Sequence, residues 1–518
     1  MTSGIANFYS GKTVFITGGT GFLGVCLIEK LLRSFPDLKN IYLLLRPKKG
    51  KQIQERLEEI RKNSVFNRFK EENKSHLFDK LIAVAGDVAE DNLGLSSADR
   101  LTLVEDVQIV FHCAASLDFE ADLKSTTTIN LLGTRRVVEL CQEIRDLKAL
   151  VHVSSAYVNC VLQEADEKVY PAPFDVKELL NLVEAKDDAT LRAETPNILK
   201  KHPNPYTFTK HLAEHEVKNG RVPAAIVRPS MTSPWMDNIE ERSARISDGC
   251  WQGRRKKTAS CEASDLRLHS SGYCCKQSYC CGVLLRTVST QLCARFCYSG
   301  RELKVFHCTS STSNPFKWLT VEPKINQFLH KYPLRSAVWY PHLKLLPSIF
   351  LFRLSALFVH MIPAYILDTV TKLGGGRPIL VRLHTNVNNS LDRLKMFIFT
   401  EWRFHNPRTM ELHKSLSETD KQLFGVDIRP LVWEDYFVDL TQGVRTYLNN
   451  ESPKTLEKAR AKDKIEFLKV YGRFWLIICI FVSFRLMVAH LGLQAAILGL
   501  LTVLASKSII MKYLNLPL

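Results

Sequence analysis

The sequence predicts an α/β fold: a doubly wound parallel sheet, followed by a mainly helical C-terminal domain and a C-terminal membrane segment. Three observations predict it. Residues 14–32 run from an apolar strand through a glycine-rich turn into a helix. A second apolar strand, 41–45, follows at the spacing of a βαβ unit, which implies a parallel pair. Residues 474–505 are predominantly apolar, as a membrane segment requires.

The turn at residues 17–24 is typical of a Rossmann-like dinucleotide site. Gly18 allows a tight turn, Gly21 lets the backbone approach a pyrophosphate, and Gly24 lets the helix pack closely on the strand. The free N–H groups at the start of the following helix favour phosphate. A structural loop without a ligand is the alternative interpretation. The predicted cofactor-binding residues of this turn are Thr17, Gly18, Thr20, Gly21, Phe22, Leu23 and Gly24.

The residue after the second strand indicates which dinucleotide binds. An NAD site would carry Asp or Glu about 20 residues past the glycines, to bond the ribose 2′-hydroxyl. This chain has Arg46 there, with Lys48 and Lys49 just behind it. Because a guanidinium suits a 2′-phosphate, we expect the cofactor to be NADPH. A solvated basic turn would explain the same residues without a ligand.

Length, charge and cysteine content limit the possible functions. The 518 residues are enough for two or three domains, and the net charge of +17 suits an anionic membrane surface or an acidic ligand such as coenzyme A. Nucleic acid is not expected as a partner, because no basic module interleaved with aromatic residues is found. The short polar N-terminus predicts no signal peptide, and hence a reducing compartment without disulfides. No metal site is expected, since the eight cysteines within residues 250–297 lack the regular spacing of a zinc site.

Two apolar stretches predict membrane attachment. Residues 471–507 contain a mainly apolar stretch of about 32 residues interrupted by Arg485, enough for one tilted helix or a shallow hairpin, with basic residues on both flanks. Residues 349–367 contain an arginine, a histidine and a proline. That composition favours an amphipathic helix in the interface, or the lining of an acyl pocket, over a span. Membrane lipid is therefore an expected partner, and the topology stays open.

Further cofactor contacts are predicted where later elements meet the carboxyl edge of the sheet. The strand within residues 81–88 ends in an acidic turn, whose aspartate is placed to bond an adenine amino group. The strand within residues 107–115 ends in small residues, which permit close passage over a cofactor. An asparagine near the start of the next helix can bridge backbone groups beneath the active site. Each could be an ordinary strand end, but their order favours cofactor binding by Asp87, Val88, Cys113, Ala114, Ala115 and Asn130.

The predicted catalytic residues are Ser155, Tyr206 and Lys210. Tyr206 and Lys210 lie one helical turn apart and share a face. An ammonium beside a phenol favours phenolate, so we expect Lys210 to lower the pKa of Tyr206 towards the range of a general acid. Ser155, at the end of a buried strand, would hydrogen-bond the same substrate oxygen. The Tyr-Lys spacing is common by chance, but here it follows a nucleotide fingerprint and a serine-tipped strand.

With these motifs the chain resembles the extended short-chain dehydrogenases and, more narrowly, the alcohol-forming fatty acyl-CoA reductases. In that family the residue at Ser155 is often threonine, which keeps the hydroxyl. The resemblance resumes at residue 303 and continues to near residue 451. The motifs that carry it are TGGTGFLG at 17–24, LLLRPK at 43–48, FHCAA at 111–115, HVSSAYVN at 152–159, YTFTK at 206–210 and IVRPS at 226–230.

The resemblance implies an NADPH-dependent, two-step reduction of long-chain fatty acyl-CoA through a bound aldehyde to a primary fatty alcohol, with release of coenzyme A. It implies that Tyr206 supplies the proton, that Lys210 also anchors the nicotinamide ribose, and that Pro229 and Ser230 lie beside the nicotinamide. It also suggests a peroxisomal membrane with the catalytic domain facing the cytosol, the endoplasmic reticulum being the alternative. Oligomeric state stays open. A sterol or steroid dehydrogenase of the same superfamily is a second interpretation, although the long C-terminal domain argues against it.

Residues 239–300 depart from the family pattern, which has here a glycine-rich apolar segment and a strand with a motif like Asp-Tyr-Ile-Pro-Val-Asp. This chain has a basic cluster and clustered cysteines instead. Residues 267–278 can be encoded by codons that, read one base later, give Asp-Tyr-Ile-Pro-Val-Asp-Ile-Val-Val-Asn-Lys. Residues 244–252 give Leu-Gly-Phe-Leu-Met-Gly-Val-Gly at the same offset. We therefore hypothesise that roughly residues 243–298 are translated out of frame; a divergent loop is the alternative. The damaged segment also suggests a third interpretation of the function, beside the reductase and the sterol dehydrogenase: a catalytically silent NADP-binding membrane protein.

The predicted organisation has five parts. They are an NADP-binding domain at 1–238, the aberrant segment at 239–300, the remainder of the substrate-side domain at 301–345, the family's C-terminal domain at 346–455 and the membrane-associated segment at 471–507.

Overall fold

The computed structural model describes residues 3–47, 50–230, 303–315, 321–337, 340–341, 343–344, 346, 348–449, 451–488 and 497–502. The described residues therefore exclude Lys48, Lys49 and the aberrant segment at 239–300. The hypothesis of a shifted reading frame concerns that segment and is not tested by the structure. The predicted membrane segment at 471–507 is described only in part.

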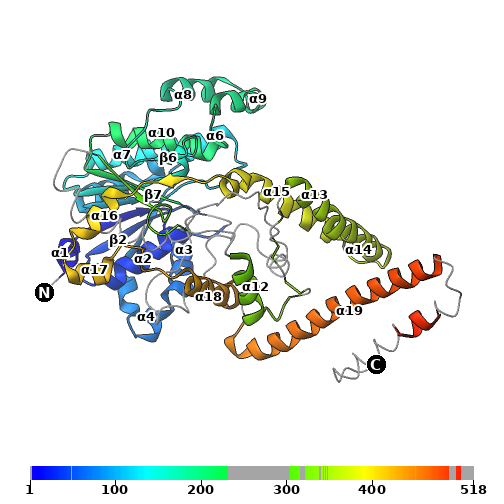
Figure 1. Cartoon of the computed structure of the whole chain (residues 1–518). Helices are drawn as coiled ribbons and strands as arrows, with labels where there is room; N and C mark the ends of the chain where they lie inside the picture. Colours follow the sequence, from blue (N-terminus) through cyan, green and yellow to red (C-terminus); the bar gives the residue numbers. More distant parts are fainter. Residues whose placement is uncertain are drawn as a thin grey trace.

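A parallel sheet forms the centre of the protein, as the sequence predicts (Figure 1). Among the described residues it has seven strands in the order β3-β2-β1-β4-β5-β7-β8. In register, the last residue of β1, Thr17, lies opposite Leu44 on one side and His112 on the other. The strand order reverses at β1, and such a switch point opens a crevice at the carboxyl ends of the strands. The strands are β1 Thr13–Thr17, β2 Asn40–Leu45, β3 Leu81–Ala85, β4 Ile109–His112, β5 Ala149–Val153, β7 Ala224–Pro229 and β8 Lys304–Cys308.

Helices cover both faces of the sheet, which confirms the doubly wound α/β class (Figure 1). The two strands of a separate small pair, β6 Glu164–Ala165 and β9 Arg403–Phe404, also run parallel. Within the first 230 residues the helices are α1 Gly4–Tyr9, α2 Phe22–Ser34, α3 Ile53–Arg61, α4 Asn67–Glu71, α5 Ser97–Asp106, α6 Leu123–Thr126, α7 Gly133–Glu143, α8 Val176–Ala185, α9 Asp188–Leu199 and α10 Pro205–Asn219. After β8 they are α12 Val321–Lys331, α13 Ile349–Ser355, α14 Ile362–Leu373, α15 Leu380–Phe399, α16 Pro407–Lys414, α17 Glu418–Phe424, α18 Trp433–Gly443 and α19 Leu456–Val488.

Part of the C-terminal region folds back onto the N-terminal domain. Leu412 and Phe424, of α16 and α17, belong to the same buried cluster as Tyr9 and Phe35. The rings of Phe35 and Phe424 stack with centroids 5.5 Å apart. The Lys30 ammonium donates a hydrogen bond of 2.9 Å to the backbone carbonyl of residue 423. Two of the helices after β8 therefore complete the core around the sheet.

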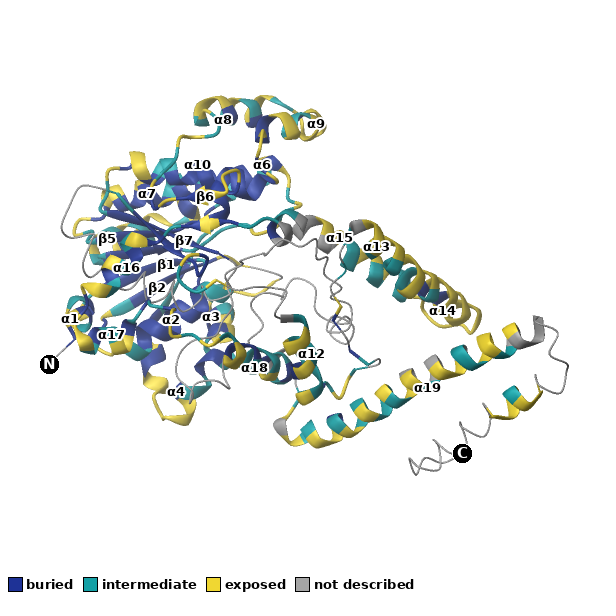
Figure 2. Ribbon diagram, in the orientation of Figure 1, coloured by how far each residue is buried: buried dark blue, intermediate teal, exposed yellow. Residues whose placement is uncertain are grey.

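A second part of the C-terminal region is apolar and exposed (Figure 2). Among the described residues, one helix is long and apolar enough to cross a membrane, Phe350–Leu373, which includes α13 and α14. Its mean hydropathy is 1.7, and only 6% of its apolar window is buried inside the protein. The long helix α19 also exposes large apolar side chains, among them Phe481 at 62%. Both elements extend away from the sheet on the same side in Figure 1.

Candidate active site

The glycine-rich turn is forced on the chain by close packing at the end of β1. Gly18 has a φ of +75°, a conformation that side chains rarely adopt, and a Cβ there would lie 2.6 Å from the backbone nitrogen of Ala114. A Cβ on Gly24 would lie 2.3 Å from the carbonyl oxygen of Gly18. Gly21 is the N-cap residue of α2. The turn and the helix start can therefore approach a ligand only because these positions are glycines.

A cavity of about 600 Å³ lies at the carboxyl ends of the strands. It brings together the glycine turn after β1, the small residues after β4, the serine after β5, and the last residue of β7 with the serine that follows it. Of the site residues predicted from the sequence, those that line it are Gly18, Thr20, Gly21, Phe22, Leu23, Gly24, Arg46, Asp87, Val88, Cys113, Ala114, Ala115, Ser155, Tyr206, Lys210, Pro229 and Ser230.

Thr17 and Asn130 support the cavity and do not line it. Thr17 Oγ1 lies 2.7 Å from Nδ1 of His112 and accepts a hydrogen bond from the backbone N–H of Ala114. Asn130 is fully buried; its Oδ1 accepts from the backbone N–H of Ser116 at 2.8 Å, and its Nδ2 donates to Thr209 Oγ1 at 3.2 Å. Asn130 thus fixes the loop after β4 to the catalytic helix, beneath the site.

Helix α10 presents Tyr206 and Lys210 to the cavity. Its start is fixed by Asn204, whose side chain accepts from the backbone N–H of Thr207, and by Pro205 at the first turn. The Lys210 ammonium donates a hydrogen bond of 2.7 Å to the backbone carbonyl of Val153, at the end of β5. Burial lowers the pKa of Lys210 to about 8. The lysine therefore ties the catalytic helix to the strand that precedes Ser155.

The pKa of Tyr206 differs from the sequence-based expectation. We expected the Lys210 ammonium to lower it, but burial of the phenol raises the pKa of Tyr206 to about 12, and a hydrogen bond with Ser155 offsets only part of this. The reason is desolvation: charging a buried phenol costs more than the nearby groups return. Tyr206 is consequently a protonated phenol at neutral pH, which suits a residue that donates a proton to a reduced substrate oxygen.

The other end of the cavity is basic. Arg46 Nη1 lies 3.0 Å from Oδ2 of Asp87, and both side chains are partly exposed. Arg56, on α3, lines the same end, and its Nη1 donates to the backbone carbonyl of Arg46 at 2.5 Å. Burial and then the Arg46 charge lower the pKa of Arg56. The two positive charges repel each other, so an anion bound between them would be stabilised. Asp87, expected to bond adenine, here pairs with Arg46.

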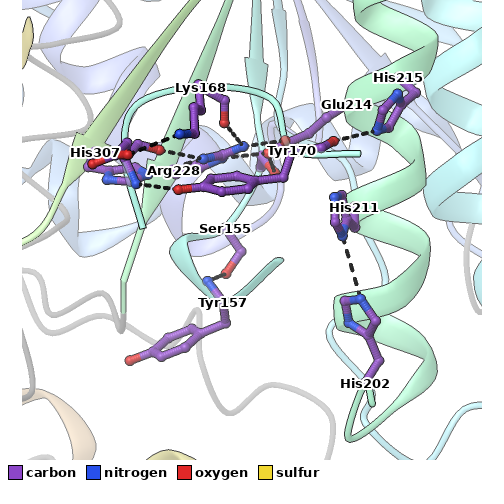
Figure 3. A network of polar contacts seen from close by, with 12 residues as sticks. Ser155, Tyr157, Lys168, Tyr170, His202, His211, Glu214, His215, Arg228 and His307 are labelled. Carbon is purple, nitrogen blue, oxygen red and sulfur yellow. Dashed lines mark hydrogen bonds and ion pairs between the residues drawn. The ribbon is translucent and has the colours of Figure 1, made fainter. Parts of the chain in front are cut away.

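A buried ion pair between α10 and β7 is linked by hydrogen bonds to β8 and the C-terminal region (Figure 3). Arg228 and Glu214 are fully buried, with Nη2 and Oε2 2.6 Å apart, and Ser154 donates a hydrogen bond of 2.6 Å to Oε1 of Glu214. Arg228 Nη1 lies 3.1 Å from Nε2 of His307 on β8, and Nδ1 of that ring bonds the backbone carbonyl of His405 at 2.8 Å. One polar network therefore connects Ser154, α10, β7 and β8 to the C-terminal region.

Sequence reasoning missed several cavity residues. Arg56 belongs to the basic stretch after the second strand, and its charge was the only available signal. Tyr157 follows the predicted Ser155 by two residues, but nothing in the pattern showed that its ring lines the cavity. The residues that line the cavity without having been predicted are Leu44, Arg56, Gly86, Ser116, Leu117, Phe119, Ile129, Val153, Ser154 and Tyr157.

Comparison with known protein families gives two matches. Residues 16–257 match a family model described as male sterility protein, of the NAD-binding type, and residues 359–451 match the Sterile model, also described as male sterility protein. Among solved structures, the terminal R domain from the myxalamid biosynthetic pathway has a TM-score of 0.50 at 18% identity, covering 82% of this chain and 92% of its own. A reductase domain of a non-ribosomal peptide synthetase from Mycobacterium tuberculosis has the same score and identity, covering 85% and 95%. At that identity the two structures support the fold alone.

Curated relatives cover nearly the whole chain. The Drosophila melanogaster protein CG8306, provisionally named a fatty acyl-CoA reductase, is 49% identical over 498 residues, which are 92% of this chain and 95% of the relative. Fatty acyl-CoA reductase 1 of Homo sapiens is 31% identical over 471 residues, 88% of each chain. Fatty acyl-CoA reductase 2 of Mus musculus is 30% identical over the same length. With a nicotinamide-binding fold, a Tyr-Lys-Ser site and this extent of similarity, the chain belongs to the fatty acyl-CoA reductase family of the extended short-chain dehydrogenases.

Proposed function

We propose that this protein is an NADPH-dependent, alcohol-forming reductase of long-chain fatty acyl-CoA, working in two steps through a bound aldehyde and releasing coenzyme A. The observation that carries the proposal is the cavity itself, which holds Ser155, Tyr206 and Lys210 together with the glycine turn. The names of the relatives support the substrate class. Similarity over 498 residues, which includes the C-terminal region, disfavours both a sterol dehydrogenase and a catalytically silent protein.

The described residues fit a nicotinamide dinucleotide phosphate. The glycine turn suits a pyrophosphate at the start of α2, because Gly18, Gly21 and Gly24 line the cavity there and a Cβ on Gly18 or Gly24 would collide with the backbone that shapes the turn. Arg46 and Arg56 form a basic end that suits a 2′-phosphate. NADPH, when bound, supplies the hydride for each reduction. This chain's own residues then have to bind the thioester, stabilise the charge on its oxygen and provide the proton.

Those tasks fall to three side chains. Negative charge develops on the carbonyl oxygen during reduction, first of the thioester and then of the aldehyde. Ser155 and Tyr206 can donate hydrogen bonds to that oxygen, and preorganised donors of this kind stabilise the transition state strongly. Because the pKa of Tyr206 is raised to about 12, its phenol carries the proton that the alkoxide takes up. Lys210, held by the carbonyl of Val153, places α10 and carries a positive charge beneath the site.

We further propose that the protein attaches to the peroxisomal membrane with its catalytic domain facing the cytosol, the endoplasmic reticulum being the alternative. The attachment is supported by the exposed apolar helices at residues 350–373 and in α19. The choice of organelle rests on the family resemblance alone. Fluorescence microscopy of the tagged chain against markers of both organelles would decide between them, and a diffuse cytosolic signal would contradict attachment.

The activity test incubates membranes that carry the full chain with palmitoyl-CoA and NADPH, and measures fatty alcohol, fatty aldehyde and free coenzyme A. Fatty alcohol as the product is expected. Aldehyde as the sole product would refute the second reduction, and absence of NADPH oxidation would refute reductase activity. The transcript is resequenced in parallel, because a shifted frame at residues 243–298 would remove part of the substrate side. An intact frame that encodes the cysteine cluster would refute that hypothesis.

A further inference from the structure

The cavity has an apolar side next to the catalytic tyrosine. Leu117, Phe119 and Tyr157 line the cavity that also holds Ser155 and Tyr206. The rings of Phe119 and Tyr206 lie with their centroids 5.5 Å apart. Leu117 is 70% exposed, so this side continues to the surface of the protein. We call Leu117, Phe119 and Tyr157 the apolar wall.

The C-terminal region backs this wall with aromatic rings. Phe397, in the last turn of α15, stacks on Phe119 with centroids 5.5 Å apart and meets the Tyr157 ring edge-on at 5.0 Å. The ring centroids of Trp402 and Tyr157 lie 5.3 Å apart. The Trp402 indole N–H donates a hydrogen bond of 3.1 Å to the backbone carbonyl of Cys160. The pairing of β6 with β9 holds the chain directly after Trp402 against the catalytic domain. Phe397 and Trp402 are each 2% exposed, so they cannot move away without repacking the core.

The two ends of the cavity differ in chemistry. Arg46, Arg56 and Asp87 make one end charged, whereas the wall makes the other end apolar. A fatty acyl thioester has one reactive carbon and a long apolar chain, and each methylene removed from water improves affinity by about fourfold. A fatty acyl chain whose thioester carbon lies at Tyr206 can gain this affinity only along the apolar side of the cavity. From Phe397, α15 leads toward the exposed apolar helices α13 and α14 (Figures 1 and 2).

We propose that the apolar wall is the acyl-binding site: the first methylenes of the fatty acyl chain lie against Phe119, Tyr157 and Leu117, and Phe397 of the C-terminal region holds this wall in place. The proposal rests on the proposed function, since it assigns the part of the site that takes the fatty chain. It gives the C-terminal region an indirect role in substrate selection, because Phe397 positions the wall and does not line the cavity itself. Figure 3 shows the Tyr157 side chain pointing away from the Arg228 network, which leaves that network to position the strands.

The test measures equilibrium binding of palmitoyl-CoA, coenzyme A and NADPH to the full chain. Phe119→Ala should weaken palmitoyl-CoA binding about tenfold, the loss of contact with one to two methylenes, and leave coenzyme A and NADPH binding unchanged. Leu117→Asp is the second variant; its position is 70% exposed, so it does not depend on repacking. It should weaken palmitoyl-CoA binding in the same way, because the leucine contact is lost and a bound acyl chain would remove water from the new carboxylate. Phe174→Ala, at another half-buried aromatic residue that lies outside the cavity, is the matched control.

The outcomes separate the two proposals. If the unaltered chain binds palmitoyl-CoA no better than coenzyme A, the substrate class itself is wrong, and the assignment of the wall fails with it. If palmitoyl-CoA binds tightly and neither Phe119→Ala nor Leu117→Asp weakens it more than Phe174→Ala does, the substrate class stands and the wall is overturned. A loss confined to palmitoyl-CoA in both wall variants supports the assignment.

Discussion

Glu214 and Arg228 form an ion pair with both side chains fully buried and their Oε2 and Nη2 atoms 2.6 Å apart. The pair connects α10 to β7. Glu214 also accepts a hydrogen bond from Ser154, the residue directly before Ser155. Charges buried in this way are stable only together, because either one alone would lack both water and a partner. The pair therefore fixes the geometry of the site without taking part in the reaction.

Removing one partner should destabilise the fold strongly. Glu214→Gln is expected to cost about 3 kcal/mol, since it leaves the Arg228 charge uncompensated in the core. Glu143→Gln, which breaks the partly exposed pair with Arg100, is the control and should cost less than about 1 kcal/mol. Thermal unfolding of both variants, with the unaltered chain alongside, measures the difference. Equal losses in the two variants would contradict the assigned role of the buried pair.

Replacing the catalytic phenol should abolish turnover without affecting cofactor binding. Tyr206→Phe is expected to lower kcat by about 10²–10⁴-fold, the range for loss of a general acid, because the phenyl ring has no proton to donate. NADPH affinity, measured by fluorescence titration, should stay unchanged. Tyr42→Phe removes a phenol of β2 that donates a hydrogen bond to Asp106 and does not line the cavity, so it serves as the control. Alcohol formation by Tyr206→Phe at the unaltered rate would refute the mechanism.

Activity should fall in mildly alkaline solution. The pKa of Lys210 is lowered to about 8 by burial, so the ammonium is present below that pH and is lost as the pH rises through it. The Tyr206 phenol, with a pKa of about 12, stays protonated throughout. The value of kcat/KM should therefore decrease by up to about tenfold per pH unit above pH 8. In Lys210→Arg this alkaline decrease should disappear, because arginine keeps its charge. A profile that is flat to pH 10 in the unaltered chain would be inconsistent with a charged Lys210 in catalysis.

The basic end of the cavity should select the cofactor. Arg46→Ala and Arg56→Ala are each expected to weaken NADPH binding by about 10–100-fold, the value of a charge-assisted hydrogen bond to phosphate, and to leave NADH binding unchanged. Arg68→Ala removes a partly exposed arginine of α4 that pairs with Glu72 at the end of the same helix, and should change neither. Competition titrations with both nucleotides provide the measurement. Parallel losses for NADPH and NADH would mean that the two arginines support the fold and do not read the 2′-phosphate.

The sequence by itself determined the fold class and most of the cavity. The glycine turn could be recognised because its geometry is local: Gly18 needs a positive φ and Gly24 needs contact with its own turn. Tyr206 and Lys210 share a helix face for the same reason. Apolar strands in a βαβ order leave few ways to pair, so the parallel sheet followed from them.

Only the tertiary structure decided which residues meet around the cavity. Phe397 reaches Phe119 from 278 positions further along the chain, and Arg56 reaches Arg46, in the turn after β2, from α3. The direction of the Tyr206 pKa was also decided there, since desolvation depends on everything packed around the phenol and not on the lysine one turn away. Local patterns specify which backbone a segment adopts, whereas burial and long-range contacts follow from how those segments pack together.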